Sequence, residues 1–163
     1  MAYKSLLTVL TDIDLAEAPI AQGISLADAN NGHLDVLALG VDRSQAGYYY
    51  AGANAMILQE TLTRAHEEAE KIESFARSVL DSSGIRWGTE SGVTQIADLG
   101  RHVAQRARFA DMVILPKPYG DGHGAELEPT IEAALFEGQT PVLVVPDGAK
   151  PLADAKTVSV AWH

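Results

Sequence analysis

Two short apolar runs near the end of the chain constrain its fold more than any other feature. The runs are 112–115 (Met-Val-Ile-Leu) and 142–145 (Val-Leu-Val-Val), and no polar residue interrupts either. Such runs are typical of strands that are covered on both faces, as in a parallel sheet. About 25 residues separate them, enough for a loop and a helical crossover. Ligands of open α/β sheets bind beyond the carboxyl ends of the strands, so the glycine-rich loop over 116–128 is where a ligand is expected.

The residues before these runs alternate between strand patterns and helix patterns. The clearest helix pattern covers 56–80, where apolar residues recur at spacings of three and four. Two other helix patterns begin near Pro19 and near Thr94, with Thr94 as a candidate N-cap. Strand patterns lie at 3–10, 34–39 and 85–90. This alternation predicts an α/β fold in three layers, with a parallel sheet between two layers of helices.

Composition excludes several classes of function. A chain of 163 residues, 47% of them apolar, can form one domain with a substantial core. It has no cysteine, which excludes disulfides, thiolate catalysis and cysteine-ligated metals. A net charge of −10 argues against nucleic acid as a partner. No apolar segment reaches the length of about 20 residues that spans a bilayer, and no signal peptide is recognisable, so we expect no membrane partner and a cytoplasmic location.

The C-terminal segment predicts that the chain is part of a longer, duplicated protein. We expect the α/β domain to cover 1–147. The residues that follow are rich in proline, alanine and charge, which indicates a linker. The run 157–162 (Thr-Val-Ser-Val-Ala-Trp) then repeats the pattern of the first strand. We therefore predict that 148–163 contain a linker and an extra strand, the first strand of a truncated second repeat.

Three segments together resemble the universal stress protein (UspA-like) family. They are the opening strand Tyr3-Lys-Ser-Leu-Leu, the segment 110–115 (Ala-Asp-Met-Val-Ile-Leu) and the closing segment 141–145 (Pro-Val-Leu-Val-Val). The resemblance covers residues 3 to about 146. It implies a Rossmann-like open sheet of five parallel strands in the order 3-2-1-4-5, and it agrees with a tandem two-domain protein. It also implies homodimers, or pairing with a second repeat, through the last strands, here Val142, Leu143, Val144 and Val145.

One branch of this family binds ATP through the motif Gly-x2-Gly-x9-Gly-Ser/Thr between the last two strands. The small residues free backbone N–H groups to surround the phosphates. The glycines of this chain in that region are Gly120, Gly122, Gly124 and Gly138. No two of them are three residues apart, so the motif cannot be placed in any register.

Other positions of the nucleotide site also depart from the family pattern. Alignment back from Pro141 puts Glu128 and Pro129 where the family has Gly-Ser/Thr. A carboxylate there would repel a triphosphate, and proline lacks an N–H donor. At the end of the first strand the family usually has Asp, whereas this chain has Thr11, with Asp12 one residue later.

These departures favour the branch that is thought not to bind ATP. We therefore expect a non-catalytic regulatory protein of the stress response that acts through dimerisation, without a cofactor, metal or catalytic residue. The alternative is a nucleotide-dependent switch that binds ATP, with slow ATP hydrolysis as part of that alternative. A flavodoxin-like protein shares only the general fold. If a nucleotide binds, the candidate residues are Thr11, Asp12, Val41, Pro116, Gly120, Gly122, Gly124 and Thr130.

Three other features carry candidate chemistry. His123, near Asp121 and Glu126, is the one histidine that could act as a ligand or as a general acid or base, and an exposed loop histidine is the competing interpretation. Asp111 precedes a strand at its amino end and is expected to be a turn residue. The loop over 42–53 contains three adjacent tyrosines, which predict either a binding surface or a flap packed on the domain.

Overall fold

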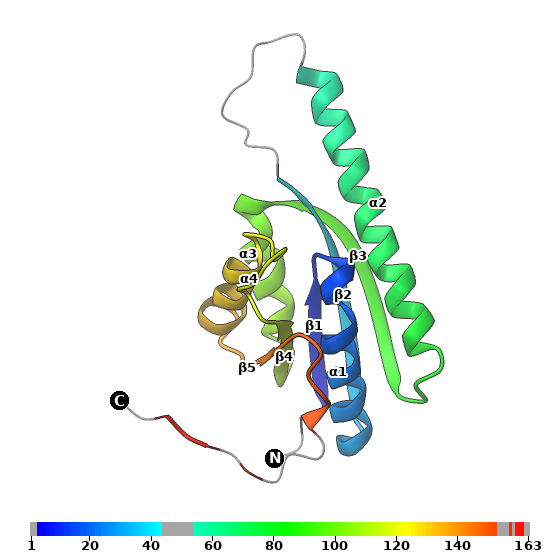
Figure 1. The fold of residues 1–163 in the computed structure, drawn as a ribbon, viewed down its shortest axis with the longest axis vertical. Coiled ribbons are helices and arrows are strands. Elements are labelled where there is room, and N and C mark those ends of the chain that lie inside the picture. The colour runs from blue at the N-terminus through cyan, green and yellow to red at the C-terminus, as the bar shows by residue number, and fades with distance from the viewer. Residues whose placement is uncertain (1–2, 44–53, 153–156, 158, 162–163) are drawn as a thin grey trace.

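The fold is a five-stranded parallel sheet between two layers of helices (Figure 1). The computed structural model describes residues 3–43, 54–152, 157 and 159–161. The strands are β1 (Ser5–Leu10), β2 (His33–Asp42), β3 (Arg86–Gln95), β4 (Met112–Pro116) and β5 (Val142–Val145). They lie in the order β3-β2-β1-β4-β5 and every neighbouring pair is parallel, which confirms the predicted fold class and strand order.

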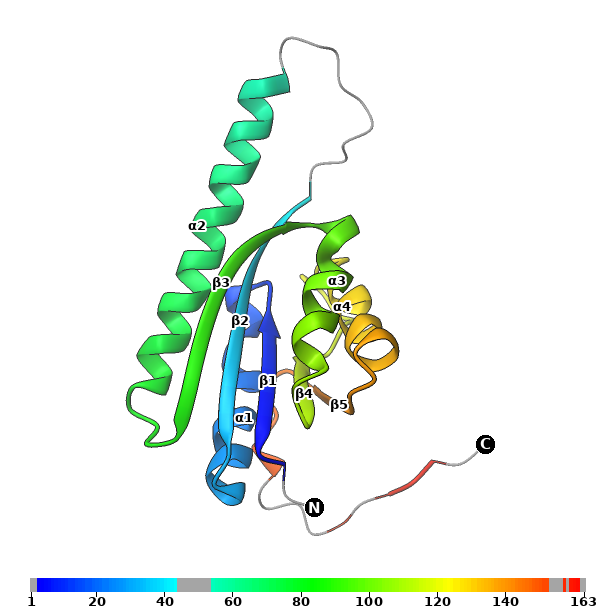
Figure 2. The same ribbon diagram turned by 180° about the vertical axis from the view of Figure 1, so that it is seen from behind.

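Each face of the sheet is covered by a different set of helices (Figure 1, Figure 2). The helices are α1 (Glu17–Asn30), α2 (Asn54–Leu80), α3 (Ile96–Ala107) and α4 (Leu127–Glu132), which continues as a π-helical turn over Ala133–Glu137. Successive strand residues point to opposite faces. Leu6 therefore packs in one core cluster with residues of α1 and α2, and Leu7 packs in a second cluster with residues of α3. Among the described helices none is long and apolar enough to cross a bilayer.

The predicted N-cap at Thr94 is wrong. Strand β3 continues to Gln95, and Thr94 is buried and paired with Val41 of β2, so its backbone belongs to the sheet and cannot cap α3. At the same edge of the sheet, the carboxylate of Asp12 accepts a hydrogen bond of 2.9 Å from the Asp14 N–H and caps a short 3-10 turn that precedes α1. Helix α1 is capped at its C-terminus by Asn31, which is in the left-handed conformation with φ of 48°.

The predicted extra strand at the C-terminus is not found. The described residues of that segment, Thr157 and 159–161, have no regular secondary structure and are exposed. A strand needs a hydrogen-bonded neighbour, and in the described part of the chain β5 pairs with β4 alone. That these residues begin a second repeat stays a prediction.

Asp111 ties the amino ends of β1 and β4 together. Its carboxylate accepts hydrogen bonds from the backbone N–H groups of Lys4 (2.7 Å) and Ser5 (2.9 Å). The bond from Ser5, and then that from Lys4, lower the pKa of Asp111. This contact holds the sheet together at the edge opposite to the expected ligand edge, which agrees with the turn role predicted for Asp111.

Glu73 of α2 holds that helix against the edge strand β3. Its Oε1 accepts hydrogen bonds of 2.8 Å from Thr89 Oγ1 and from Arg77 Nη2. Hydrogen bonding from Ser91, and then from Arg77 and Thr89, lowers the pKa of Glu73 to about 2. Because the folded-state pKa lies below the usual value of 4.5, the ionised Glu73 contributes stability above that pH, and the contribution disappears as the pH falls toward 2.

Glu73→Gln is therefore expected to lower the free energy of unfolding at neutral pH by about 1 kcal/mol, because charge-assisted hydrogen bonds become neutral ones. The difference from the parent protein should shrink when urea unfolding is measured near pH 3 instead of near pH 7. Glu70→Gln, an exposed carboxylate of the same helix, serves as the control and should change little at either pH. An effect of Glu73→Gln that is the same at both pH values would contradict this account.

Candidate functional site

The candidate site lies at the carboxyl edge of the sheet, between β1 and β4. From β1 the chain continues to β2 and β3 on one side of the sheet. Strands β4 and β5 are then added on the other side of β1. Such a switch in direction opens a crevice where ligands of α/β proteins bind. Thr11 and Asp12 follow β1, Arg43 follows β2, and residues 117–126, the glycine loop, follow β4.

The glycine loop is fixed from inside by His123. Its Nδ1 lies 2.8 Å from the Lys117 carbonyl oxygen and must donate to it, while Nε2 lies 3.4 Å from Asp147 Oδ2. The imidazole is only 4% exposed, and it packs against Gly120, where a Cβ atom would lie 3.0 Å from His123 Nε2. The expectation of an exposed loop histidine is therefore wrong. His123 has a buried imidazole, and its contacts set the shape of the loop.

The carboxylate of Glu126 fills the crevice at the end of the loop. It is 1% exposed, and it accepts hydrogen bonds from Arg43 Nη2 at 2.5 Å and from Arg43 Nε at 3.4 Å. Glu68 of α2 adds a weaker ion pair to the same guanidinium, at 3.6 Å. The hydrogen bond to Glu126, assisted by the nearby carboxylates, raises the pKa of Arg43 although partial burial opposes this. The pair thus joins the end of β2 to the loop that follows β4.

Gly124 makes this arrangement possible. A Cβ atom placed on Gly124 would lie 2.4 Å from both carboxylate oxygens of Glu126, a distance that real contacts do not reach. The φ of Gly124 is not in the left-handed region, so the requirement for glycine here is one of space. The backbone of the loop therefore wraps closely around an anionic group that belongs to the chain itself.

A small cavity remains beside the pair, and we call it the edge cavity. It measures about 150 Å³ and is lined by Thr11, Asp12, Arg43, Lys71 and neighbouring residues of α2. The Thr11 hydroxyl is buried there without a hydrogen-bond partner. Ligand pockets usually measure about 300–1,000 Å³, so the edge cavity by itself is smaller than a typical ligand pocket. Those residues also contain no cluster of three or more groups that could bind a metal ion.

Comparison with solved structures identifies the fold. The hypothetical protein MJ0577 superposes with a TM-score of 0.66 at 17% identity, over 92% of this chain and 100% of that chain. UspA from Lactobacillus plantarum gives a TM-score of 0.59 at 15% identity, over 89% and 99% of the two chains. The universal stress protein from Archaeoglobus fulgidus, solved with dAMP, gives 0.52 at 14% identity over 89% and 99%. No protein-family model and no curated protein matches the sequence.

This chain has the universal stress protein fold. The fold that the sequence resemblance implied is thereby confirmed. Universal stress proteins with cAMP and with AMP are also among the structural neighbours, so proteins of this fold bind adenosine nucleotides.

Within the universal stress protein fold, the predicted nucleotide residues are only partly brought together. Thr11 and Asp12 line the edge cavity. Val41 and Pro116 lie within β2 and β4 and are paired with neighbouring strands, Val41 with Thr94 and Pro116 with Val145. Of the remaining candidates, Gly120 and Gly122 are exposed, Gly124 supports the Glu126 carboxylate, and Thr130 is buried with its hydroxyl donating to the Glu126 carbonyl oxygen at 2.7 Å.

The carboxylate that is buried in the glycine loop is that of Glu126 and not that of Glu128. The side chain of Glu128 is exposed and accepts a hydrogen bond of 2.9 Å from the Tyr119 hydroxyl, which raises the pKa of Tyr119. Sequence reasoning also missed Arg43. A basic residue directly after a buried strand, at the ligand edge of a strongly acidic chain, was the available signal. The three tyrosines at 48–50 lie outside the described residues.

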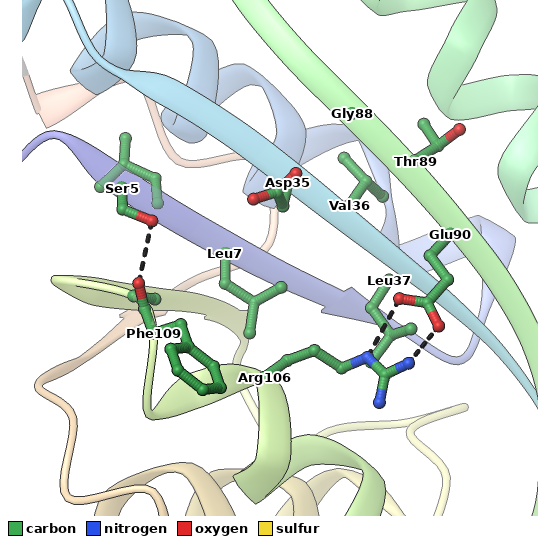
Figure 3. Close-up of a pocket in the computed structure, with 12 residues that line it drawn as sticks. Ser5, Leu7, Asp35, Val36, Leu37, Gly88, Thr89, Glu90, Arg106 and Phe109 are labelled. Carbon is green, nitrogen blue, oxygen red and sulfur yellow. Dashed lines mark hydrogen bonds and ion pairs between the residues drawn. The ribbon is translucent and has the colours of Figure 1, made fainter.

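A second hollow, of about 340 Å³, lies on the α3 face near the amino ends of the strands (Figure 3). Leu7 and Leu37 are in its floor, and Phe109 stands at its rim. The charged groups around it are already paired, Arg106 with Glu90 and Asp35 with His33. The residues that line it are therefore mainly apolar or belong to ion pairs. None of them is a buried charged group like Glu126 at the carboxyl edge.

Gly124→Ala tests the close packing of the loop on Glu126. The added methyl group must displace the carboxylate, so we expect the free energy of unfolding to fall by about 1–3 kcal/mol. Gly92→Ala is the matched control, because a Cβ there would meet only Leu39 Cδ2 at 3.8 Å, an ordinary contact. Urea unfolding of both variants decides the point, and equal stability of the two would show that Glu126 can leave its position without cost.

Proposed function

We propose that this chain is a non-catalytic, regulatory protein of the universal stress protein type, which acts through association of its sheet edge with another copy or repeat. The single observation behind this proposal is the buried Glu126 carboxylate, held by Arg43 in the crevice where a nucleotide phosphate would lie. No cofactor and no chemical step belong to the proposed activity. A role in the cytoplasmic stress response is part of the same proposal and follows from the fold resemblance.

Electrostatics argues against a triphosphate in this crevice. Two like charges about 4 Å apart at an effective dielectric constant of about 20 repel each other by roughly 4 kcal/mol. A triphosphate would meet the Glu126 carboxylate in the crevice and also the Glu68 carboxylate that faces Arg43. Expelling Glu126 instead would break its hydrogen bonds to Arg43.

Isothermal titration of the protein with ATP and magnesium tests this part of the proposal. We expect no binding in the micromolar range, because the carboxylates of Glu126 and Glu68 in the crevice repel the phosphates. Micromolar affinity for ATP would overturn the proposal and favour a nucleotide-dependent switch.

Strand β5 supplies the surface for association. It has four residues, all apolar, and in the described part of the chain it pairs only with β4. Val142 and Leu143 are partly buried and Val144 is 39% exposed. An apolar edge of this kind invites pairing with another strand. A second copy, or the second repeat of a longer protein, would cover both the free backbone groups and the exposed valine.

Val144→Lys is expected to weaken this association, because a charged side chain at an apolar strand edge opposes strand pairing. Sedimentation velocity over a range of concentrations should show a dimer for the parent protein and a shift toward monomer for the variant. Met56→Lys, at a position on α2 that is 82% exposed, is the control and should leave the association unchanged. A parent protein that stays monomeric at every concentration would count against dimerisation through β5.

The second candidate function is a nucleotide-dependent switch. It is favoured by the Thr11 hydroxyl, which is buried at the carboxyl edge without a partner, and by the nucleotides held by several proteins of this fold. An adenosine nucleotide that stays bound through purification, detected by mass spectrometry, would support this candidate over the first.

A further inference from the structure

We infer that the Glu126 carboxylate is an internal occupant of an anion site, that Arg43 is the ligand of this site, and that removing the carboxylate opens the site to a phosphate monoester. The inference rests on the proposed function in one respect: both assume that the phosphate of a nucleotide would lie in this crevice. It adds a specificity-determining residue, because a single side chain would then decide whether the crevice accepts an external anion.

The geometry of Arg43 suits a phosphate as well as it suits a carboxylate. Its Nε and Nη2 approach Glu126 together, at 3.4 Å and 2.5 Å, in the fork arrangement by which guanidinium groups bind both carboxylates and phosphates. The Arg43 side chain is 45% exposed, whereas Glu126 is 1% exposed. An anion from solvent can therefore reach the guanidinium, but the inner position beside it is already filled.

The glycine loop is shaped for an anion at that inner position. Gly124 offers a backbone without a side chain where the carboxylate oxygens lie. Earlier in the loop, Gly122 has φ of 79°, a backbone conformation that residues other than glycine rarely adopt. The space where its Cβ would lie is empty. His123, between these two glycines, anchors the loop through Lys117 and Asp147. The loop conformation thus has an anchor of its own that does not involve Glu126.

The balance of charge explains why the site would be closed in the parent protein. The carboxylates of Asp12, Glu68 and Glu126 lie around Arg43, and Lys71 lines the same edge cavity. Three acidic groups thus face two basic ones, and an external anion is repelled. Without Glu126 the two signs are equal in number, Arg43 lacks its main partner, and the volume of the lost side chain adds to the edge cavity. A single phosphate group matches this space better than a triphosphate.

The test compares the binding of inorganic phosphate to the parent protein and to Glu126→Ala by isothermal titration at fixed ionic strength. We expect Glu126→Ala to bind phosphate at least about tenfold more tightly than the parent protein. Its melting temperature should rise when phosphate replaces chloride, because a ligand that binds only the folded state stabilises it. Glu128→Ala, which removes an exposed carboxylate two residues away, is the control and should behave like the parent protein.

Two further variants make the result decisive. Glu126→Gln keeps the volume of the side chain but removes its charge, so it should also bind phosphate more tightly than the parent protein, and it replaces Glu126→Ala if that variant does not fold. The double variant with Glu126→Ala and Arg43→Met should lose the gain. The inference is overturned if neither single variant at position 126 binds phosphate more tightly, or if the double variant keeps the gain. Sedimentation of the same variants reports separately on association, so a failure here leaves the proposed function of β5 intact.

Discussion

The ion pair of Glu126 and Arg43 joins segments that are 83 residues apart and closes the ligand edge of the sheet. Only the Glu126 side of this pair is buried, and such a pair is not by itself evidence of high stability, because removing the carboxylate from water costs about as much as its attraction to Arg43 returns. Removal of one partner is different, since it leaves the other charge without compensation. The pair therefore fixes the geometry of the crevice more than it stabilises the fold, whereas the glycine loop is anchored separately by His123.

The stability of the fold comes from the sheet and its two apolar clusters. Strands β1 and β4 are buried on both faces. The buried Thr8 hydroxyl between them donates a hydrogen bond of 2.8 Å to the Ile114 carbonyl oxygen. Helices α1 and α2 cover one face, and α3, α4 and the π-helical turn cover the other. This rigid support places the ends of β1, β2 and β4 side by side. A site made of three separate segments can then be as precise as one carried on a single helix.

The sequence predicted most of the fold because the fold depends on patterns that repeat locally. Unbroken apolar runs marked β4 and β5, and three- and four-residue spacing marked α2, although the start of α3 was misplaced because Thr94 continues the ladder of β3. The site depends on contacts between distant residues, and local patterns carry little information about these. Arg43 could not be connected to Glu126 by any spacing, and the sequence pattern pointed to Glu128, whose side chain is exposed, and not to the buried Glu126. The role of His123 depends on Asp147, which follows β5, and only the folded chain brings the two together.

The two edges of the sheet differ in a way that supports association through β5. Strand β3 carries charged and hydroxyl side chains along its length, and several of these are bound by neighbouring helices, as Thr89 is by Glu73 and Glu90 by Arg106. Such an edge is poorly suited to pairing with another strand, which is how many proteins protect their sheets. Strand β5 has no charged residue, no proline within it and no bulge, and it presents Val144 to solvent. The edge strand β5 is short and apolar, whereas the opposite edge strand β3 is protected by polar side chains. Of the two edges, only β5 thus has the features of a strand that pairs with a further strand. A crevice closed by Glu126 is compatible with this, because association through β5 does not require the crevice to open.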